Sequence, residues 1–205
     1  DNLDYIADMG FNCIWLNPFF PDQTHHGYHA TDHFSINPRL GTLDDMQELV
    51  KIAHAKEIRL LLDFVGNHIG SGHAYFQDAL AHEDSPYHDW FCWEEWPEKY
   101  AAYFHVPDLP ELNTNNLEVR QYMFDSVRYW LAEIGFDGLR MDYVLGPSHD
   151  FWTELRQTVR QIKPDAWMFG EATHTPEQLM TYNGRFDTCL DFLLTQHIRD
   201  TFAFN

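Results

Sequence analysis

The sequence has 205 residues and is strongly acidic: 13 Lys and Arg residues stand against 32 Asp and Glu residues, which gives a formal net charge of −19. This charge argues against nucleic acid or an anionic membrane surface as a partner, since both bind a basic face. No run approaches the roughly 18 consecutive apolar residues of a transmembrane helix. The aromatic share of 16% argues against intrinsic disorder, and the hydrophobic share of 44% is enough for a real core.

Short apolar runs alternate with amphipathic segments along the chain. Thr42 is a typical N-cap for one of these segments, because Asp44 and Asp45 follow it in the first turn. The apolar runs predict strands at residues 11–16, 59–65, 136–144, 167–172 and 186–191. The amphipathic segments predict helices at residues 2–9, 43–54, 117–134, 150–162 and 193–202.

Repeated strand–helix units indicate parallel strands joined by right-handed crossovers, either in an open doubly wound sheet or in a closed (β/α)₈ TIM barrel. No Gly-rich phosphate loop follows a predicted strand, which weakens the nucleotide-binding form of the open sheet. Polar side chains follow the carboxyl ends of four separate strands, where barrel active sites are built; these are Asn17, Asp63, Asp142 and Glu171. The sequence therefore predicts an α/β fold of the TIM-barrel type.

Residues 69–113 interrupt the strand–helix alternation and are too long for an ordinary loop. Ten aromatic residues lie in this stretch. We interpret it as a small subdomain inserted after a barrel strand. Its rings either form its own core or stack on sugar rings at the mouth of a cleft, and we expect both uses.

Arg140 and Asp142 are two residues apart on a predicted strand and so point to the same face. In a barrel they face inward, and the neighbouring guanidinium is expected to lower the pKa of the Asp142 carboxyl, as a carboxylate nucleophile requires. A purely structural ion pair is the alternative.

Glu171 ends the following strand among apolar neighbours, where desolvation is expected to raise its pKa, as suits a general acid. One ionised and one protonated carboxyl group are what glycoside hydrolysis requires. His68 follows a third strand, after Asp63 and Asn67, and is either a sugar ligand or an ordinary strand-end histidine.

Together these segments resemble the conserved regions of the α-amylase family of glycoside hydrolases (family 13). Asp63 to His68, Gly138 to Asp142 and Gly170 to Ala172 match its first three regions in the right order, and the similarity spans essentially the whole chain. The fourth region, which carries a third catalytic carboxylate, has no match in this sequence.

The resemblance implies retaining cleavage of α-glucosidic bonds in an α-glucan or malto-oligosaccharide, with Asp142 as nucleophile and Glu171 as general acid and base. It makes Arg140, His68 and Tyr28 contacts of the sugar or the nucleophile, and Asp63 a supporting carboxylate in the substrate site. Asn67 and Glu111 correspond to possible ligands of a structural Ca²⁺ ion, and no organic cofactor is expected.

An α-amylase acting on starch-like substrates fits this pattern. The alternatives are a transglycosylase of the same family, such as a glucanotransferase or trehalose synthase, and a carbohydrate-binding barrel that has lost activity. Where the family often has Lys-His after the nucleophile, this chain has Leu145-Gly146, and a contact to the sugar on the reducing side is missing.

The motif map also predicts how the chain divides. Residues 1–68 begin the catalytic barrel, 69–113 form the subdomain inserted after the third barrel strand, and 114–205 continue the barrel. Because a full barrel needs about 250 residues, we expect only about strands 2–6 here, without the last two strands. Residues 1–205 are accordingly expected to be inactive alone.

Overall fold

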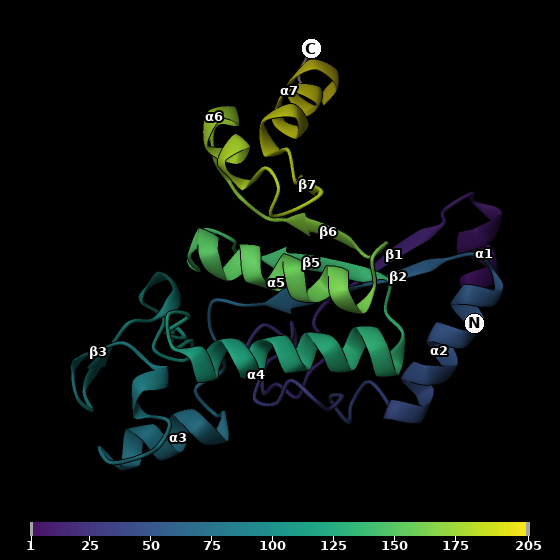
Figure 1. Ribbon diagram of the computed structural model, residues 1–205. Helices are drawn as coiled ribbons and strands as arrows, with labels where there is room; N and C mark the ends of the chain where they lie inside the picture. The colour runs from purple at the N-terminus through teal and green to yellow at the C-terminus, as the bar shows by residue number, and fades with distance from the viewer. Residues whose placement is uncertain (1, 204–205) are drawn as a thin grey trace.

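The computed structural model describes residues 2–203, and one parallel sheet of five strands forms its centre (Figure 1). The strands lie in the order β1 (Cys13–Leu16), β2 (Arg59–Val65), β5 (Gly138–Asp142), β6 (Trp167–Gly170) and β7 (Thr188–Cys189). Each strand of this sheet pairs in parallel with the strand of the same sheet that follows it along the chain. A barrel adds its strands in this way, whereas a doubly wound sheet reverses its strand order.

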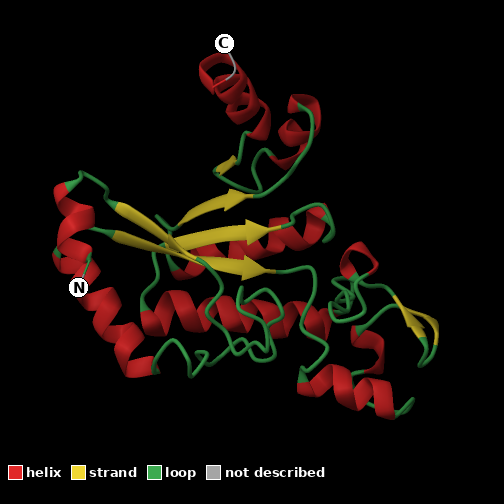
Figure 2. Cartoon of the chain, turned by 180° about the vertical axis from the view of Figure 1, so that it is seen from behind, coloured by secondary structure: helices red, strands yellow, loops and turns green. Residues whose placement is uncertain are grey.

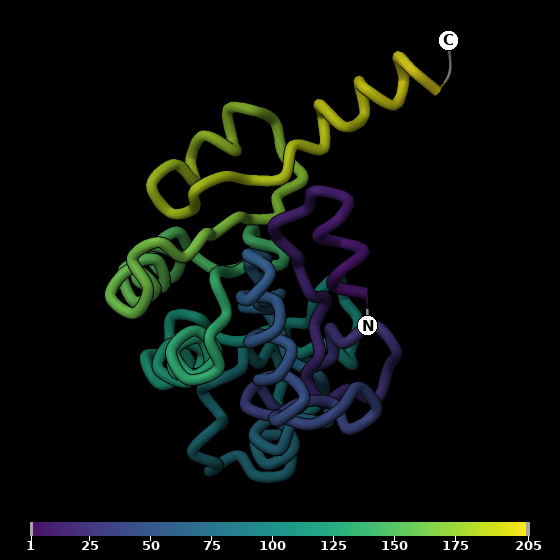
Figure 3. Tube along the Cα trace, turned by 90° about the vertical axis from the view of Figure 1, so that its right-hand side faces the viewer, coloured from purple at the N-terminus to yellow at the C-terminus, as the bar shows by residue number. Residues whose placement is uncertain are grey.

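Helices connect these strands and cover the sheet. They are α1 (Leu3–Asp8), α2 (Leu43–Ala55), α4 (Leu117–Arg128), α5 (His149–Ile162), α6 (Pro176–Leu179) and α7 (Phe192–Ala203). α4 and α5 lie side by side along one face of the sheet (Figures 1 and 2). α7 extends away from the other elements (Figure 3), so it does not help to position the site described below. In residues 2–203, none of the helices combines the length and hydropathy needed to cross a bilayer.

The predicted elements are all present, with shifted ends. The helix expected at 117–134 begins at Leu117, because the Asn116 side chain caps it, but its last six residues form a π-helix, Tyr129–Ile134. Gly135 then ends it with a φ of 101°, a conformation that glycine adopts without strain. The strands expected at 136–144 and 186–191 are shorter, Gly138–Asp142 and Thr188–Cys189.

Residues 69–113 fold into α3 (Ala74–Ala81), two 3₁₀ turns at His88–Trp90 and Tyr103–His105, and a hairpin of β3 (Trp93–Glu95) and β4 (Lys99–Tyr100). The aromatic side chains pack together and join the core of the barrel: Phe76 is fully buried, the rings of Tyr75 and Tyr87 stack with centroids 3.9 Å apart, and Tyr75 also contacts the ring of Tyr122 on α4. This inserted subdomain lies beyond the carboxyl ends of the strands (Figure 2). A bridge between His68 and Glu111 joins its end to the end of β2.

Candidate active site

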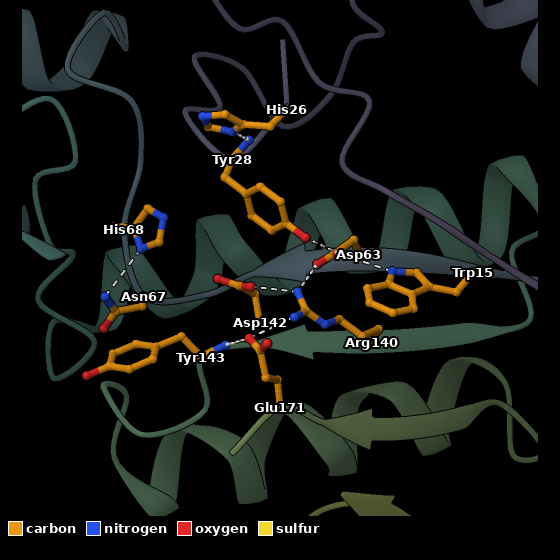
Figure 4. A network of polar contacts seen from close by, with 10 residues as sticks. All are labelled: Trp15, His26, Tyr28, Asp63, Asn67, His68, Arg140, Asp142, Tyr143 and Glu171. Carbon is orange, nitrogen blue, oxygen red and sulfur yellow. Dashed lines mark hydrogen bonds and ion pairs between the residues drawn. The ribbon is translucent and has the colours of Figure 1, made fainter. Parts of the chain in front are cut away.

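Three neighbouring strands place charged side chains at one edge of the sheet (Figure 4). Asp63 on β2 is the register partner of Arg140 on β5, and Asp142 lies two residues further along β5. Glu171 directly follows β6 and is tied to β5 because its backbone N–H donates to the carbonyl of Met141. The predicted inward direction of Arg140 and Asp142 is confirmed, because both side chains are buried on the same side of β5. Arg140 contacts Asp142 on its own strand and Asp63 on the neighbouring strand.

The Arg140 guanidinium bridges three carboxylates. Its Nη1 lies 2.8 Å from Asp63 Oδ1 and 2.6 Å from Asp142 Oδ1, and its Nη2 lies 2.7 Å from Glu171 Oε2. A guanidinium is suited to this because its donors are fixed in one plane and can serve several acceptors at once. The site is therefore a four-residue network rather than the simple Arg–Asp pair suggested by spacing.

This network carries an excess of negative charge, because three carboxylates face one guanidinium. Burial, together with the charges of Asp63 and Glu171, raises the pKa of Asp142 to about 7 even though the adjacent Arg140 lowers it. Burial likewise raises the pKa of Asp63. The expectation of a lowered Asp142 pKa is wrong in direction, since it considered Arg140 but not the neighbouring carboxylates.

Glu171 differs from the isolated, desolvated carboxyl group that the sequence suggested. Besides its ion pair with Arg140, its Oε2 accepts a hydrogen bond of 3.3 Å from the backbone N–H of Tyr143. Its side chain is 29% exposed and is the most accessible of the three carboxylates. Glu171 is thus the carboxylate that a ligand reaches most easily.

Asp63 lies below the pocket and supports its floor. It is 0% exposed, and its Oδ2 accepts hydrogen bonds from the hydroxyl of Tyr28 at 3.1 Å and from Nε1 of Trp15 at 3.0 Å. Asp63 thus holds the side chains of Tyr28 and Arg140 in place. Trp15, which the sequence reasoning missed, also places its ring 4.8 Å from the Arg140 guanidinium carbon.

A pocket of about 470 Å³ opens above this network. The strand ends supply its floor, the loop after β1 supplies a histidine-rich wall, and the inserted subdomain supplies another wall. The lining residues are His26, Tyr28, His29, His68, Tyr103, Leu109, Arg140, Asp142 and Glu171. Asn17, which also follows a strand, is not among them.

His68 lines this pocket, and its ring is neutral. Burial lowers its pKa to about 4, so the ring is uncharged at neutral pH. Its Nε2 is buried and has no hydrogen-bond partner among residues 2–203. The centroid of its ring lies 4.5 Å from that of Tyr103, one of the ten aromatic residues of the insert, which the sequence did not single out from the other nine. An unpartnered nitrogen at this place fits the binding of a sugar hydroxyl.

The two expected calcium ligands, Asn67 and Glu111, are neighbours, and the Asn67 amide would have to turn its oxygen toward the carboxylate to share an ion with it. Asn67 Nδ2 faces Glu111 Oε1 at 3.4 Å, so a nitrogen rather than an oxygen approaches the carboxylate. Calcium takes six to eight oxygen ligands. No group of three or more His, Cys, Asp or Glu side chains in the described part of the chain is arranged to hold a metal ion. Calcium binding stays a prediction.

Comparison with known proteins shows which protein family this sequence resembles. The family described as "Alpha amylase, catalytic domain" matches residues 1–204. Alpha-amylase 2 of Dictyoglomus thermophilum is 38% identical over 200 residues, covering 98% of this chain and 35% of that protein. A cyclomaltodextrinase of Geobacillus thermopakistaniensis is 37% identical over 210 residues, covering 99% of this chain and 36% of that protein.

The fold has close counterparts among solved structures. The cyclic α-maltosyl-(1→6)-maltose hydrolase of Arthrobacter globiformis, in complex with that sugar, superimposes with a TM-score of 0.92 at 34% identity over 98% of this chain and 46% of its own. The chain spans about a third of the length of the curated relatives. The predicted (β/α)₈ barrel, present in part, is confirmed. With its residues matched almost end to end, the chain belongs to the α-amylase family of glycoside hydrolases, family 13.

Proposed function

We propose that the protein carrying this chain hydrolyses α-1,4-glucosidic bonds in starch-like α-glucans, with retention of configuration and through a covalent glycosyl-enzyme. The observation that carries the proposal is the Arg140 guanidinium, which gathers Asp63, Asp142 and Glu171 at the floor of one pocket. The names of the relatives, an alpha-amylase and a cyclomaltodextrinase, support an α-glucan substrate.

In the first step, Asp142 attacks the anomeric carbon. Its Oδ1 is held by Arg140 at 2.6 Å, while its other oxygen points away from the guanidinium (Figure 4). That oxygen forms the new bond as the glycosidic C–O bond breaks, and Glu171 transfers its proton to the departing oxygen. Burial and the neighbouring carboxylates raise the pKa of Asp142 to about 7, so the attack requires that Asp142 has lost its proton.

In the second step, Glu171 takes a proton from water as the water oxygen attacks the anomeric carbon and the ester bond to Asp142 breaks. Two displacements at one carbon restore the original configuration. Both carboxyl groups contact one guanidinium, which favours the short separation of about 5–5.5 Å typical of retaining enzymes. Retention is measured by NMR of the newly released anomer.

A transglycosylase would use the same residues, with a sugar hydroxyl in place of water. A product profile from starch, maltotriose and cyclodextrin distinguishes these reactions, because transfer yields products longer than the substrate. The intact pair of Asp142 and Glu171 argues against a barrel that only binds carbohydrate.

The test of the nucleophile is Asp142→Asn in the full-length protein. We expect at least a 10³-fold loss of kcat on a maltosaccharide, because the amide cannot form the ester. Asp89→Asn, on the exposed surface, is the matched control and should keep full activity. Substantial turnover by Asp142→Asn would remove the nucleophile assignment.

The test of the acid is Glu171→Gln. We expect a large loss of kcat on maltosaccharides and a much smaller loss on an aryl maltoside, because an aryl oxygen leaves without protonation. Equal losses on the two substrates would show that Glu171 is not the proton donor.

We also propose that calcium, where it binds, is held near Asn67 and Glu111 and serves stability alone. EDTA should then lower the melting temperature of the full-length protein, and Glu111→Gln should abolish this shift. An identical melting temperature with and without EDTA would exclude the site.

A further inference from the structure

The hydrogen-bond ladder between β5 and β6 is irregular where the two strands end. In a regular parallel pair, a residue whose N–H donates to the neighbouring strand accepts, through its own carbonyl, from the residue two positions further along that strand. The Glu171 N–H donates to the Met141 carbonyl at 2.9 Å, so the regular donor to the Glu171 carbonyl would be Tyr143. The donor is instead Val144, at 3.1 Å. Tyr143 is therefore an extra residue in the ladder, as in a β-bulge, and its N–H is released from the sheet.

The released N–H of Tyr143 donates to the side chain of Glu171. Its nitrogen lies 3.3 Å from Glu171 Oε2, and Arg140 Nη2 lies 2.7 Å from the same oxygen (Figure 4). The backbone conformation that directs the N–H there is unfavourable, since Tyr143 has a φ of 38°, where residues other than glycine are uncommon. Such a residue persists only where the surrounding structure holds it.

The residues that follow Tyr143 hold the bulge in place. Val144 is fully buried, and its carbonyl accepts hydrogen bonds from Trp152 Nε1 at 2.9 Å and from the Tyr182 hydroxyl at 3.2 Å. Gly146 packs so closely on the end of β2 that a Cβ atom at this position would lie 1.8 Å from Asn67 Oδ1. Because the loop after β5 is fixed on both sides, the direction of the Tyr143 N–H is fixed as well.

Both donors to the Glu171 carboxyl group lie on the same oxygen. A backbone N–H and a guanidinium can donate but cannot accept, so a proton on Oε2 would face groups that have no lone pair to receive it. Among residues 2–203, no hydrogen bond or ion pair to Oε1 is present beside these two contacts to Oε2. A protonated Glu171 therefore carries its proton on Oε1.

We propose that the backbone N–H of Tyr143 is a positioning group for proton transfer. Together with Arg140 it keeps Oε2 as an acceptor, so that Oε1 is the oxygen that gives and takes the proton. The inference rests on the proposed function, since it takes Glu171 as the general acid and base. In the first step the Oε1–H bond breaks as the proton moves to the departing oxygen, and the two donors at Oε2 stabilise the carboxylate that remains. In the second step Oε1 takes a proton from the attacking water.

Two substitutions at Tyr143 in the full-length protein separate the direction of the N–H from the ring. Both Tyr143→Gly and Tyr143→Val remove the ring, but glycine accepts a φ of 38° without strain whereas β-branched valine does not. Valine should therefore draw the backbone toward the regular ladder, in which the N–H bonds to the Glu171 carbonyl and not to Oε2.

The measured quantity is kcat/KM on maltotriose divided by kcat/KM on an aryl maltoside, because the sugar leaving group needs protonation and the aryl group does not. Tyr143→Val should lower this ratio about tenfold, as expected for loss of one hydrogen bond to a charged group. Tyr143→Gly should keep the ratio near that of the wild type, because its N–H still points at Oε2.

A second variant removes the N–H itself. The α-hydroxy analogue of tyrosine at position 143 puts an ester oxygen in place of the N–H, keeps the ring and should lower the ratio as Tyr143→Val does; it decides the question if Tyr143→Val does not fold. An unchanged ratio in the ester variant, or equal ratios for Tyr143→Val and Tyr143→Gly, would overturn the inference and leave the proposed function intact. Failure of the proposed function is distinguishable, because the ratio would then be unchanged in Glu171→Gln.

Discussion

At the scale of single residues, the candidate site depends on one cation. Arg140 is 3% exposed and contacts all three carboxylates through its two terminal nitrogens. Lysine at this position would supply one point charge without the planar fork, so it could not hold three acceptors in the same relative positions. Removing the charge altogether would leave buried carboxylates unpaired, which is more costly than losing a surface ion pair.

The raised pKa of Asp142 predicts a cost in stability. A buried acid whose folded pKa lies above its unfolded value of 3.8 destabilises the native state as pH rises between the two values. Asp142→Asn removes this cost, so it should raise the melting temperature at pH 8 and change it little at pH 4. Each kcal/mol corresponds to about 2–4 °C for a domain of this size. An equal shift at both pH values, measured by circular dichroism, would contradict the pKa assignment.

At the scale of elements, a buried hydrogen-bonded chain links three segments. The hydroxyl of Tyr122 on α4 lies 3.1 Å from Nδ1 of His33, in the loop after β1, and 3.0 Å from Nε2 of His73, at the start of the inserted subdomain. His73 Nδ1 accepts from the Tyr75 N–H, so its Nε2 carries the proton and donates to Tyr122, whose own proton goes to His33. These hydrogen bonds therefore fix the inserted subdomain to the barrel.

Tyr122→Phe tests this link. The substitution keeps the ring but leaves two buried histidine nitrogens without partners, so we expect a loss of about 2–4 kcal/mol in the free energy of unfolding. Tyr129→Phe, about two turns later where α4 continues as a π-helix, is the control. Urea denaturation of the full-length variants gives both values, and similar midpoints for the two would show that the link contributes nothing.

At the scale of the whole molecule, buried neutral histidines predict sensitivity to acid. Burial lowers the pKa of His33 to about 3 and that of His73 to about 4, although the nearby Asp32 acts in the opposite direction on both. The unfolded chain takes up these protons below about pH 6.5 and the folded chain does not. Stability is therefore lost as pH falls below about 6.5, and the loss continues toward pH 4 and below.

His33→Gln isolates this contribution, because Gln can still accept from Tyr122. Between pH 6.5 and 5, the free energy of unfolding of the wild type should fall by about 1.6 kcal/mol more than that of the variant. His82→Gln, at an exposed position, should follow the wild type. If the free energy of unfolding fell equally with pH in the wild type and in His33→Gln, the result would contradict a neutral buried His33.

The sequence predicted the elements and the strand-end charges well, because both depend on local order. Period-two alternation placed Arg140 and Asp142 on one face, and a barrel brings strand ends such as Asp63 and Glu171 together without further information. Where each element stops was less predictable: the π-helical end of the helix at 117–134 and the two-residue β7 depend on tertiary packing.

What the sequence could not predict depends on contacts between distant segments. The sign of the Asp142 pKa shift is set first by burial and then by the carboxylates of Asp63 and Glu171, which come from other parts of the sheet edge. Tyr103 reaches the pocket only because the inserted subdomain folds back on β2. Trp15 carried a weak signal, since it lies two residues before Asn17 and so shares its side of β1. Asn17 itself, the more obvious candidate, stays outside the pocket.

The division of the pocket between two folding units has a consequence for how such a protein can change. Arg140 and Asp142 lie on a strand of the sheet and Glu171 directly follows one, whereas Tyr103 and Leu109 belong to the inserted subdomain. Replacing residues in the insert can therefore alter which ring lies beside Glu171 while Asp142 and Glu171 keep their places. The walls and the floor of the pocket thus come from different segments of the chain, and one can change in sequence while the other stays the same.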